Sequence, residues 1–341
     1  MTTSDLVKIL GFYGRFTPTY SRIGYLGRRT QWPSFKPDFS GQRWLVTGAS
    51  GGIGAAIVAG AARAGATVVA VARSADKLEA ARAALEPEAA QRVENLVCDL
   101  SSVAAIDELL KQLRDSGKPI EVLQNNVGVL FNEMEITDEG FEATYVTNLL
   151  GHYQLTEGLM ASELLSPGAV IVNMASGGLY NVPLNTKLLN VTDPAHYGGK
   201  AVYASHKRAQ VALAGIWDER LRKHGGRAYV MHPGWVKTEG VRRSLPMFYK
   251  IQGVILRSGA EGADTALWLA SERPEESGRN IWLDRAVRQQ HVFAHTVEPK
   301  CSETDLLEFL KRDLASANAG TRDPADAQAE ATVEAAPDSN P

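Results

Sequence analysis

Cysteine is scarce in this chain: of its 341 residues, only Cys98 and Cys301 carry a thiol. Two cysteines so far apart cannot form the disulfide framework of a small secreted domain, and they match no zinc-binding spacing. We therefore expect no bound metal and a reducing, cytoplasmic environment. Cys98 falls in a strand that we expect to be buried, where a thiol acts as a small hydrophobic group.

Long hydrophobic runs and a strong net charge are absent as well. No stretch approaches the roughly 18 consecutive apolar residues that span a bilayer, and the N-terminus lacks the pattern of a signal peptide. A formal net charge of -3 leaves no electrostatic footprint for nucleic acid, so we expect none as a partner. With 44% hydrophobic and 22% charged residues, the chain can bury the core of one α/β domain with appendages.

Composition divides the chain into three parts, of which residues 1–40 are aromatic and carry six basic residues against two acidic ones. Their apolar side chains could make a peripheral contact with a membrane interface, or pack on the domain or on a second subunit of an oligomer; these are Leu6, Ile9, Leu10, Phe12, Tyr13 and Phe16. We favour packing, because Pro18 should end a helix early. Residues 41–315 form the main domain, and residues 316–341 are predicted to be a disordered acidic tail.

The main domain alternates apolar runs with helical patterns. The predicted strands are Trp44–Thr47, Thr67–Ala72, Val93–Asp99, Ile120–Gln124, Ala169–Met174, Arg227–His232 and Asn280–Leu283. The predicted helices between them are Gly52–Ala64, Ala75–Leu85, Val103–Asp115, Gly140–Leu165 and Tyr203–Lys223. This alternation predicts right-handed βαβ units, and therefore a Rossmann-type, doubly wound parallel sheet of seven strands in a three-layer αβα arrangement.

A glycine-rich turn follows the first predicted strand and opens a helix, which is the context that makes a dinucleotide-binding motif credible. Gly48 allows the tight turn, Gly52 lets the backbone approach a pyrophosphate, and Gly54 lets the helix pack closely on the sheet. Ser50 and Ile53 lie in the same turn. The free N–H groups at the start of the helix attract phosphate.

The same turn is compatible with two other classes of protein. Through Gly51 it also fits the Gly-x-x-Gly-x-x-Gly pattern of sugar-nucleotide enzymes. Residues 48–52 are also a formal Gly-x-Ser-x-Gly, in which Ser50 would be the nucleophile of a serine hydrolase. A nucleotide-binding sensor without turnover is a third alternative. We favour an oxidoreductase, because the remaining motifs fit a dehydrogenase better.

Tyr203 and Lys207 are four residues apart on a predicted helix, so both side chains lie on one face. Free Tyr titrates near pH 10, and a nearby ammonium favours its ionised form. Tyr203 could therefore exchange a proton with a substrate oxygen, while Ser176, at the end of a strand, donates a hydrogen bond to that oxygen.

These residues resemble those of the short-chain dehydrogenase/reductase family, and the wording of several runs is similar to its retinol-dehydrogenase-like branch. The matching pieces follow the family's order over residues 41–285: Thr47–Gly54, Cys98–Leu100, Asn125–Gly128, Asn148, Ser176, Tyr203 with Lys207, and Pro233–Thr238. Val127 stands where the family usually has Ala. The resemblance implies an oxidoreductase that uses Asn148, Ser176, Tyr203 and Lys207, in which Asn148 anchors a water that links Lys207 to solvent.

For the cofactor, the resemblance implies a nicotinamide dinucleotide, and Arg73 favours NADP(H). NAD-dependent members carry an acidic residue at the end of the second strand, whereas Arg73 can grip a 2′-phosphate there. By resemblance, Asp99 contacts the adenine, and Val236 and Thr238 bind the carboxamide. The other expected cofactor contacts are Leu100, Asn126, Gly128, Pro233, Gly234, Tyr203 and Lys207.

We expect a hydrophobic carbonyl or alcohol as the substrate, because apolar residues flank the catalytic motifs. The expected pocket residues are Leu179, Tyr180, Trp235, Leu245 and Phe248, and residues 240–257 should form a lid. His291 and His295 are spaced as two helical metal ligands, but no third ligand accompanies them, so we interpret them as exposed polar residues. We expect His206 to face outward.

Overall fold

A computed structural model of the chain describes residues 16–319. Its centre is one sheet of eight strands in the order β3-β2-β1-β4-β5-β6-β7-β8. The strands are β1 Arg43–Thr47, β2 Thr67–Ala72, β3 Val93–Val97, β4 Ile120–Asn125, β5 Leu165–Met174, β6 Arg227–Met231, β7 Ile281–Leu283 and β8 Ala286–Arg288. The first seven pair in parallel, which confirms the predicted doubly wound sheet.

The eighth strand was not predicted from the sequence. β8 pairs antiparallel with β7 through a two-residue turn in which Asp284 and Arg285 have φ of 54° and 55°. Two successive residues with positive φ match the right-handed twist of a hairpin. Only Val287 of the three β8 residues is strongly apolar, so the sequence carries no strand pattern there.

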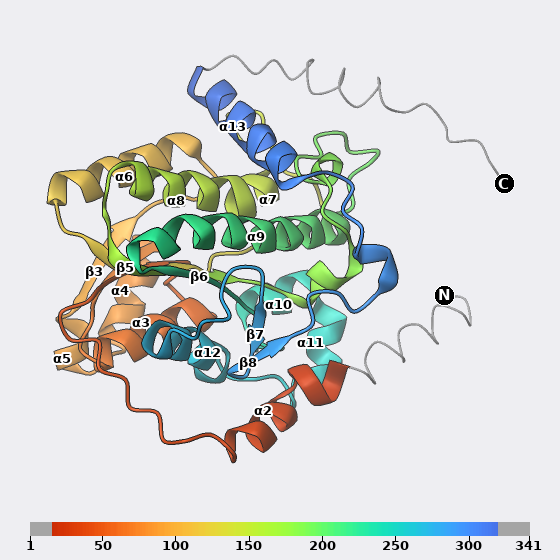
Figure 1. Cartoon of the computed structure of the whole chain (residues 1–341). Helices are drawn as coiled ribbons and strands as arrows, with labels where there is room; N and C mark the ends of the chain where they lie inside the picture. Colours follow the sequence, from red (N-terminus) through yellow and green to blue (C-terminus); the bar gives the residue numbers. More distant parts are fainter. Residues whose placement is uncertain (1–15, 320–341) are drawn as a thin grey trace.

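Helices cover both faces of the sheet (Figure 1). They are α2 Arg22–Arg29, α3 Gly52–Arg63, α4 Ala75–Ala83, α5 Pro87–Ala90, α6 Val103–Ser116, α7 Ala143–Tyr145, α8 Gly151–Ala161, α9 Gly199–Leu221, α10 Glu239–Ser244, α11 Pro246–Gln252, α12 Gly259–Glu272 and α13 Glu303–Ala319. In Figure 1, α6, α8 and α9 lie above the sheet, and α3 and α12 lie below it. Because both faces are covered, β1 is buried along its whole length.

The prediction of one long helix over Gly140–Leu165 is wrong in its bounds and continuity, because the range is divided into three helical segments. Glu142 caps α7 by accepting hydrogen bonds from Thr144 N (2.9 Å) and Tyr145 N (2.7 Å). The turn at Val146–Leu150 is then a π-helix, and α8 ends at Ala161. π-turns are rare and often occur at functional sites, and this one contains Asn148.

At both ends the helices extend further than expected, whereas the burial of Phe16 agrees with the predicted packing of the N-terminal aromatic residues. Residues 16–20 are helical in spite of Pro18, and a Cβ on Gly24 would lie 1.7 Å from Pro18 O, so only glycine fits at that contact. Phe16, Tyr20 and Tyr25 are buried. α13 runs past residue 315 to Ala319, so the first four residues of the predicted tail are helical.

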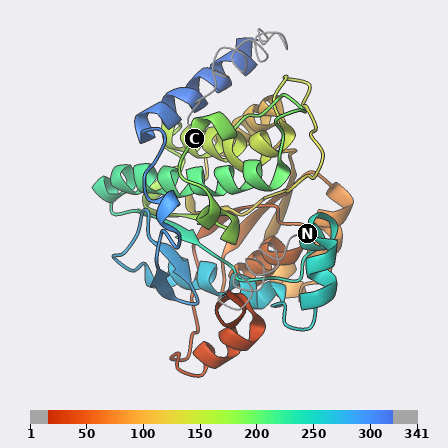
Figure 2. The ribbon, with the colours of Figure 1, turned by 90° about the vertical axis from the view of Figure 1, so that its right-hand side faces the viewer.

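The remaining predictions for the two ends, on Leu6, Ile9, Leu10, Phe12, Tyr13 and residues 320–341, lie outside the described residues. Figure 1 and Figure 2 show α2 and α13 at opposite ends of the molecule. Within residues 16–319, no helix combines the length and the apolar character needed to cross a bilayer.

Candidate active site

The strand order reverses between β1 and β4, which are direct neighbours in the sheet. β1 connects outward to β2 and β3, whereas the chain continues on the other side from β4 to β5 and β6. The loops after β1 and β4 therefore diverge and leave a crevice, where ligands of open parallel sheets bind. The glycine-rich turn follows β1, and Asn126 follows β4, so both predicted motifs meet at this point.

The glycine-rich turn needs its glycines. Gly48 and Gly52 have φ of 67° and 57°, a backbone conformation that residues other than glycine rarely adopt. A Cβ on Gly54 would lie 2.2 Å from Gly48 O, so the start of α3 packs directly on the turn. Asn126 fixes the turn from the next strand, since its Nδ2 donates to Thr47 O at 2.8 Å.

The start of α3 faces the segment after β6. A Cβ on Gly52 would lie 3.0 Å from Thr238 Cγ2, and a Cβ on Gly262 would contact both Val236 Cγ2 and Ile53 Cγ1. The first turn of α3 has no side-chain cap, so its N–H groups are free for an anion. Within residues 16–319, Ser50 has no hydrogen bond to a base, which speaks against a hydrolase.

Arg73 directly follows β2 and is exposed. Among the described residues, its guanidinium makes no hydrogen bond or ion pair. Asp99, two residues after β3, accepts hydrogen bonds from Ser101 N (3.0 Å) and Ser101 Oγ (2.8 Å). Leu100 is buried. The glycines with positive φ and the uncapped helix together fit the phosphates of a dinucleotide.

Ser176, Tyr203 and Lys207 come together beside the same crevice. Ser176 lies two residues after β5, while Tyr203 and Lys207 lie one turn apart on α9. The Ser176 hydroxyl lies close enough to the Tyr203 phenol to favour its ionised form. Lys207 Nζ lies 5.7 Å from the centroid of the Tyr203 ring and donates to Met174 O at 2.8 Å. A Cβ on Gly128 would lie 3.3 Å from Lys207 Nζ, so Gly128 leaves room for the ammonium.

Burial controls the proton affinities of this group. It lowers the pKa of Lys207 to about 7. It raises the pKa of Tyr203, and the hydrogen bond with Ser176 opposes that rise. The sequence led us to expect that Lys207 lowers the pKa of Tyr203, but in the free protein desolvation dominates, because it disfavours the charged form of both groups.

Asn148 is held by the loop after β4. Its Oδ1 accepts from Val129 N, and its Nδ2 donates to Val129 O, both at 2.8 Å. Its main-chain oxygen accepts from Gln210 Nε2 at 2.5 Å. The sequence analysis missed Gln210, although the residue stands seven positions after Tyr203 and therefore on the same face of the helix.

The turn after β6 lies between the N-terminal segment and a buried arginine. Gly234 has a φ of 77°, and a Cβ there would lie 2.3 Å from Arg257 Nε. Arg257 Nη1 donates to Pro233 O at 3.3 Å. Tyr20 O accepts from Trp235 N at 2.8 Å, so the N-terminal segment supports this turn directly.

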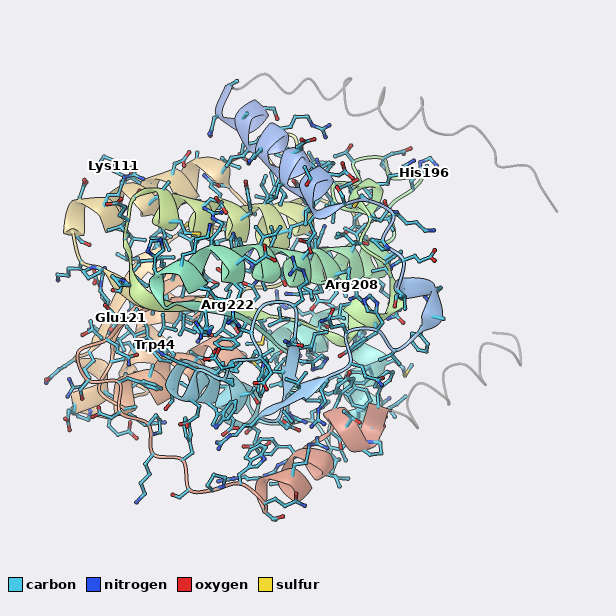
Figure 3. The ribbon with its side chains drawn as sticks, viewed as in Figure 1. Trp44, Lys111, Glu121, His196, Arg208 and Arg222 are labelled. Atoms are coloured by element: carbon cyan, nitrogen blue, oxygen red, sulfur yellow. The ribbon has the colours of Figure 1, made fainter. Side chains whose placement is uncertain are left out.

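Leu179 and Tyr180 do not line an open pocket, contrary to the expectation. They are 0% and 2% exposed, and Tyr180 stacks on Phe16 with 6.3 Å between ring centroids. Arg208, labelled on α9 in Figure 3, donates to Leu179 O at 2.7 Å. The N-terminal segment covers these side chains, and a sequence pattern cannot show such a long-range contact.

The lid residues lie on α10 and α11. Ser244 Oγ donates to Leu130 O at 2.6 Å, so the lid touches the loop after β4. Trp235 and Phe248 pack edge to face with 5.2 Å between centroids. Leu245 and Phe248 are half-buried. These three residues remain candidates for substrate contact.

One of the three histidines discussed above, His206, lies elsewhere than predicted. His206 is buried rather than outward-facing, because its Nε2 is hydrogen-bonded to Leu189 O at 2.6 Å. His291 lies in a loop, 3.1 Å from Thr296 Oγ1, and His295 is exposed. In the part of the chain that the structure describes, no group of three or more His, Cys, Asp or Glu side chains could hold a metal.

Comparison with known proteins agrees with this geometry. The short chain dehydrogenase family profile matches residues 42–187. Dehydrogenase/reductase SDR family member 12 of Bos taurus is 32% identical over 321 residues, covering 90% of this chain and 97% of the relative. Polyprenol dehydrogenase of Homo sapiens is 29% identical over 261 residues, covering 73% and 78%.

A solved structure of an uncharacterized protein from Mycobacterium paratuberculosis has the same fold, with a TM-score of 0.64, 23% identity, and coverage of 82% of this chain and 95% of that one. The similarity to family member 12 also agrees with the branch that the sequence motifs indicate. The crevice at the β1–β4 switch point, the Tyr203–Lys207 pair and these relatives lead to one assignment: the chain belongs to the short-chain dehydrogenase/reductase superfamily, whose members act on small molecules with a nicotinamide cofactor.

Proposed function

We propose that the protein is an NADP(H)-dependent oxidoreductase that transfers a hydride between the nicotinamide and a hydrophobic carbonyl or alcohol. One observation carries this proposal: the Ser176 hydroxyl lies close enough to the Tyr203 phenol to influence its pKa, and Lys207 lies one helical turn away. Two neighbouring hydroxyls can together bind one substrate oxygen. The bound cofactor would supply or accept the hydride at the neighbouring carbon.

In this proposal Tyr203 is the general acid of carbonyl reduction and the general base of alcohol oxidation. Its phenol gives a proton to the substrate oxygen, and Ser176 donates a hydrogen bond to that oxygen. Because burial raises the pKa of Tyr203, the phenol stays protonated at neutral pH, as reduction requires. Lys207 would hold the ribose and favour the phenolate once the proton has left.

The preference for NADP(H) rests on Arg73. Its guanidinium is exposed and without a partner among residues 16–319, at the end of β2, where the ribose of a dinucleotide is bound in Rossmann folds. Its planar fork can hold two phosphate oxygens. Gly48, Gly52 and Gly54, with the first turn of α3, would hold the pyrophosphate, and Asp99 the adenine.

An apolar substrate is supported by the side chains above the crevice. In this proposal Trp235, Leu245 and Phe248 would form an apolar wall, and Tyr203 and Ser176 would be the polar groups that face the substrate. The name of the related polyprenol dehydrogenase points to a long hydrophobic alcohol. We propose a medium or large hydrophobic carbonyl or alcohol rather than a sugar or a small hydroxy acid.

A peripheral membrane contact would suit such a substrate. On α2, Ile23 and Leu26 are 65% and 41% exposed and Arg29 is exposed, whereas Arg22 and Arg28 are paired with Glu261 and Asp284. An exposed apolar pair beside an exposed arginine fits an anionic lipid surface. Flotation with vesicles of anionic lipid should retain the protein, and Ile23→Asp should release it; equal flotation of both would rule this contact out.

The oxidoreductase proposal is tested by following NADPH absorbance against a panel of ketones and aldehydes. We expect turnover of retinoid, steroid or lipid-derived carbonyls and little with sugars. Tight NADPH binding without turnover of any carbonyl would favour the alternative, a nucleotide-binding sensor. A fluorophosphonate probe that leaves Ser50 unlabelled would remove the hydrolase alternative.

A further inference from the structure

Gln210 lies three residues after Lys207 on α9 and is 1% exposed. Its Oε1 accepts from Lys207 Nζ at 3.1 Å. Its Nε2 donates to Asn148 O at 2.5 Å and lies 3.0 Å from His152 Nδ1. Only this orientation of the amide fits, because the reverse would set an NH₂ against the ammonium and an oxygen against the carbonyl.

Gln210 therefore lies between Lys207 and the main-chain oxygen of Asn148. The sequence led us to expect a water there, anchored by Asn148. The side chain of Asn148 is occupied by Val129, with two hydrogen bonds of 2.8 Å. The main-chain oxygen of Asn148, which could have held that water, accepts its hydrogen bond from the Gln210 amide instead.

We propose that Gln210 is a positioning residue that holds the Lys207 ammonium in place of a bridging water and closes the route for protons from Lys207 toward Asn148. The proposal rests on the proposed function. A side-chain amide has no titratable proton near neutral pH, so it holds a cation without relaying its proton. The proton that Tyr203 gives to a substrate then has to be replaced from the crevice.

The surroundings of Lys207 contain no compensating negative charge. The titratable groups that face it are Tyr203 and His206 on α9 and His152 on α8. Burial lowers the pKa of His152 to about 3 and that of His206 to about 4, so both are neutral above pH 5. Among residues 16–319, no carboxylate forms an ion pair with Lys207. Its ammonium therefore depends on two neutral acceptors, Met174 O and Gln210 Oε1.

Two substitutions of Gln210 distinguish the effect of its hydrogen bonds from the effect of its side-chain volume. Gln210→Met keeps most of the volume and removes the hydrogen bonds with Lys207, Asn148 and His152, whereas Gln210→Ala leaves a polar space that a water can enter and bridge. We expect Gln210→Met to lower kcat for carbonyl reduction about tenfold and to move the alkaline limb of kcat/KM about one pH unit lower. Gln210→Ala should retain more activity than Gln210→Met, although it removes more of the side chain.

A matched control is Gln154→Met on α8. Gln154 is also buried, and its Nε2 donates to Val103 O (3.0 Å) and Asp107 Oδ1 (2.9 Å), away from the crevice. It should cost comparable stability and leave the alkaline limb in place. A shift of the limb in Gln154→Met as well would show that general loosening moves it, and would overturn the proposal.

A second measurement does not need turnover. The ¹³Cε signal of Lys207 in ¹³C-lysine-labelled, cofactor-free protein, assigned with Lys207→Arg, should titrate at lower pH in Gln210→Met than in the wild type. An unchanged midpoint, or higher activity in Gln210→Met than in Gln210→Ala, would overturn the proposal. If the wild type reduces no carbonyl, the proposed function fails, while the titration still decides the role of Gln210.

Discussion

The two sides of the crevice are built in different ways. On the cofactor side, the glycine-rich turn, Asn126 and the start of α3 hold one another through contacts between neighbouring β-strands and their loops. On the substrate side, Tyr20 supports Trp235, and Arg28 reaches Asp284 across 256 positions of sequence. Local motifs therefore encode the first side, whereas the second exists only when distant segments of the chain meet.

Among the predicted effects, the largest should come from removing the proton donor Tyr203, which lies between the two sides. Tyr203→Phe removes only the phenolic oxygen, so kcat should fall by about 10² to 10⁴, the usual contribution of a general acid. NADPH affinity should change little, because the cofactor contacts remain. Absorbance assays and calorimetry measure the two quantities.

Tyr229→Phe is the matched control for that substitution. Tyr229 OH donates to Pro274 O at 2.7 Å, away from the crevice, so its loss should leave kcat unchanged. Turnover near the wild-type level in Tyr203→Phe would mean that another group carries the proton.

The substrate side should lose most from Asp284→Asn. Asp284 is 2% exposed and accepts from Arg257 Nη1 (2.6 Å), Arg257 Nη2 (2.9 Å) and Arg28 Nε (2.7 Å). Removing its charge leaves the buried Arg257 unpaired, which costs about 3 to 5 kcal/mol. Urea unfolding should reveal that loss.

The comparison between the two sides predicts that folded Asp284→Asn still binds NADPH. Asp264→Asn, at the less deeply buried pair with Arg285, should cost less than Asp284→Asn. Equal losses in both variants would contradict the special role of the buried pair.

Acid should destabilise the protein through three buried histidines. Burial lowers the pKa of His152 and His232 to about 3 and that of His206 to about 4. The unfolded chain binds protons on these groups below about pH 6.5, and the folded chain does not. Stability should therefore fall between pH 7 and pH 5 by about 2 kcal/mol for each histidine.

Denaturant unfolding at pH 7, 6 and 5 checks this slope. His206→Gln should remove about 2 kcal/mol of it, whereas His224→Gln, at an exposed position, should leave the slope as it is. An unchanged slope in His206→Gln would show that this imidazole is protonated in the folded state.

On the cofactor side, Arg73→Asp should weaken NADPH binding about ten- to hundredfold and favour NADH, because it removes charge-assisted hydrogen bonds to the 2′-phosphate. Calorimetry measures the affinities of the wild type and of Arg73→Asp for NADPH and NADH. Arg114→Asp, which makes the same charge change at the end of α6, should change neither affinity. Equal affinity of the wild type for NADH and NADPH would refute the role of Arg73.

The lid should show the smallest effect. Phe248→Ala removes a half-buried ring beside Trp235, and KM for large hydrophobic carbonyls should rise about tenfold at most. Met247 is 69% exposed on the same helix, so Met247→Ala should leave KM unchanged. An effect of Met247→Ala as large as that of Phe248→Ala would place the substrate outside the predicted wall.

The sequence predicted one side of the crevice better than the other for a physical reason. Gly48, Gly52, Tyr203 and Lys207 are constrained by backbone geometry or by one helical turn, so their spacing reveals their arrangement. The burial of Tyr180 beneath Phe16 depends on segments more than 160 residues apart, as the stacking of these rings shows, and no local pattern encodes it. The π-turn around Asn148 and the hairpin of β8 were missed because neither has a period that binary patterning reveals.

The pairing of Arg28 with Asp284 also sets an order of events at the ribosome. The arginine leaves the exit tunnel long before its aspartate, which follows only after all the parallel strands have been synthesised. The glycine-rich turn and Asn126 can meet as soon as β4 has been synthesised, because their contact spans only 79 residues. A nascent chain that stalls before residue 284 would therefore hold most of the parallel sheet while Arg28 and the buried Arg257 still lack the carboxylate that they share.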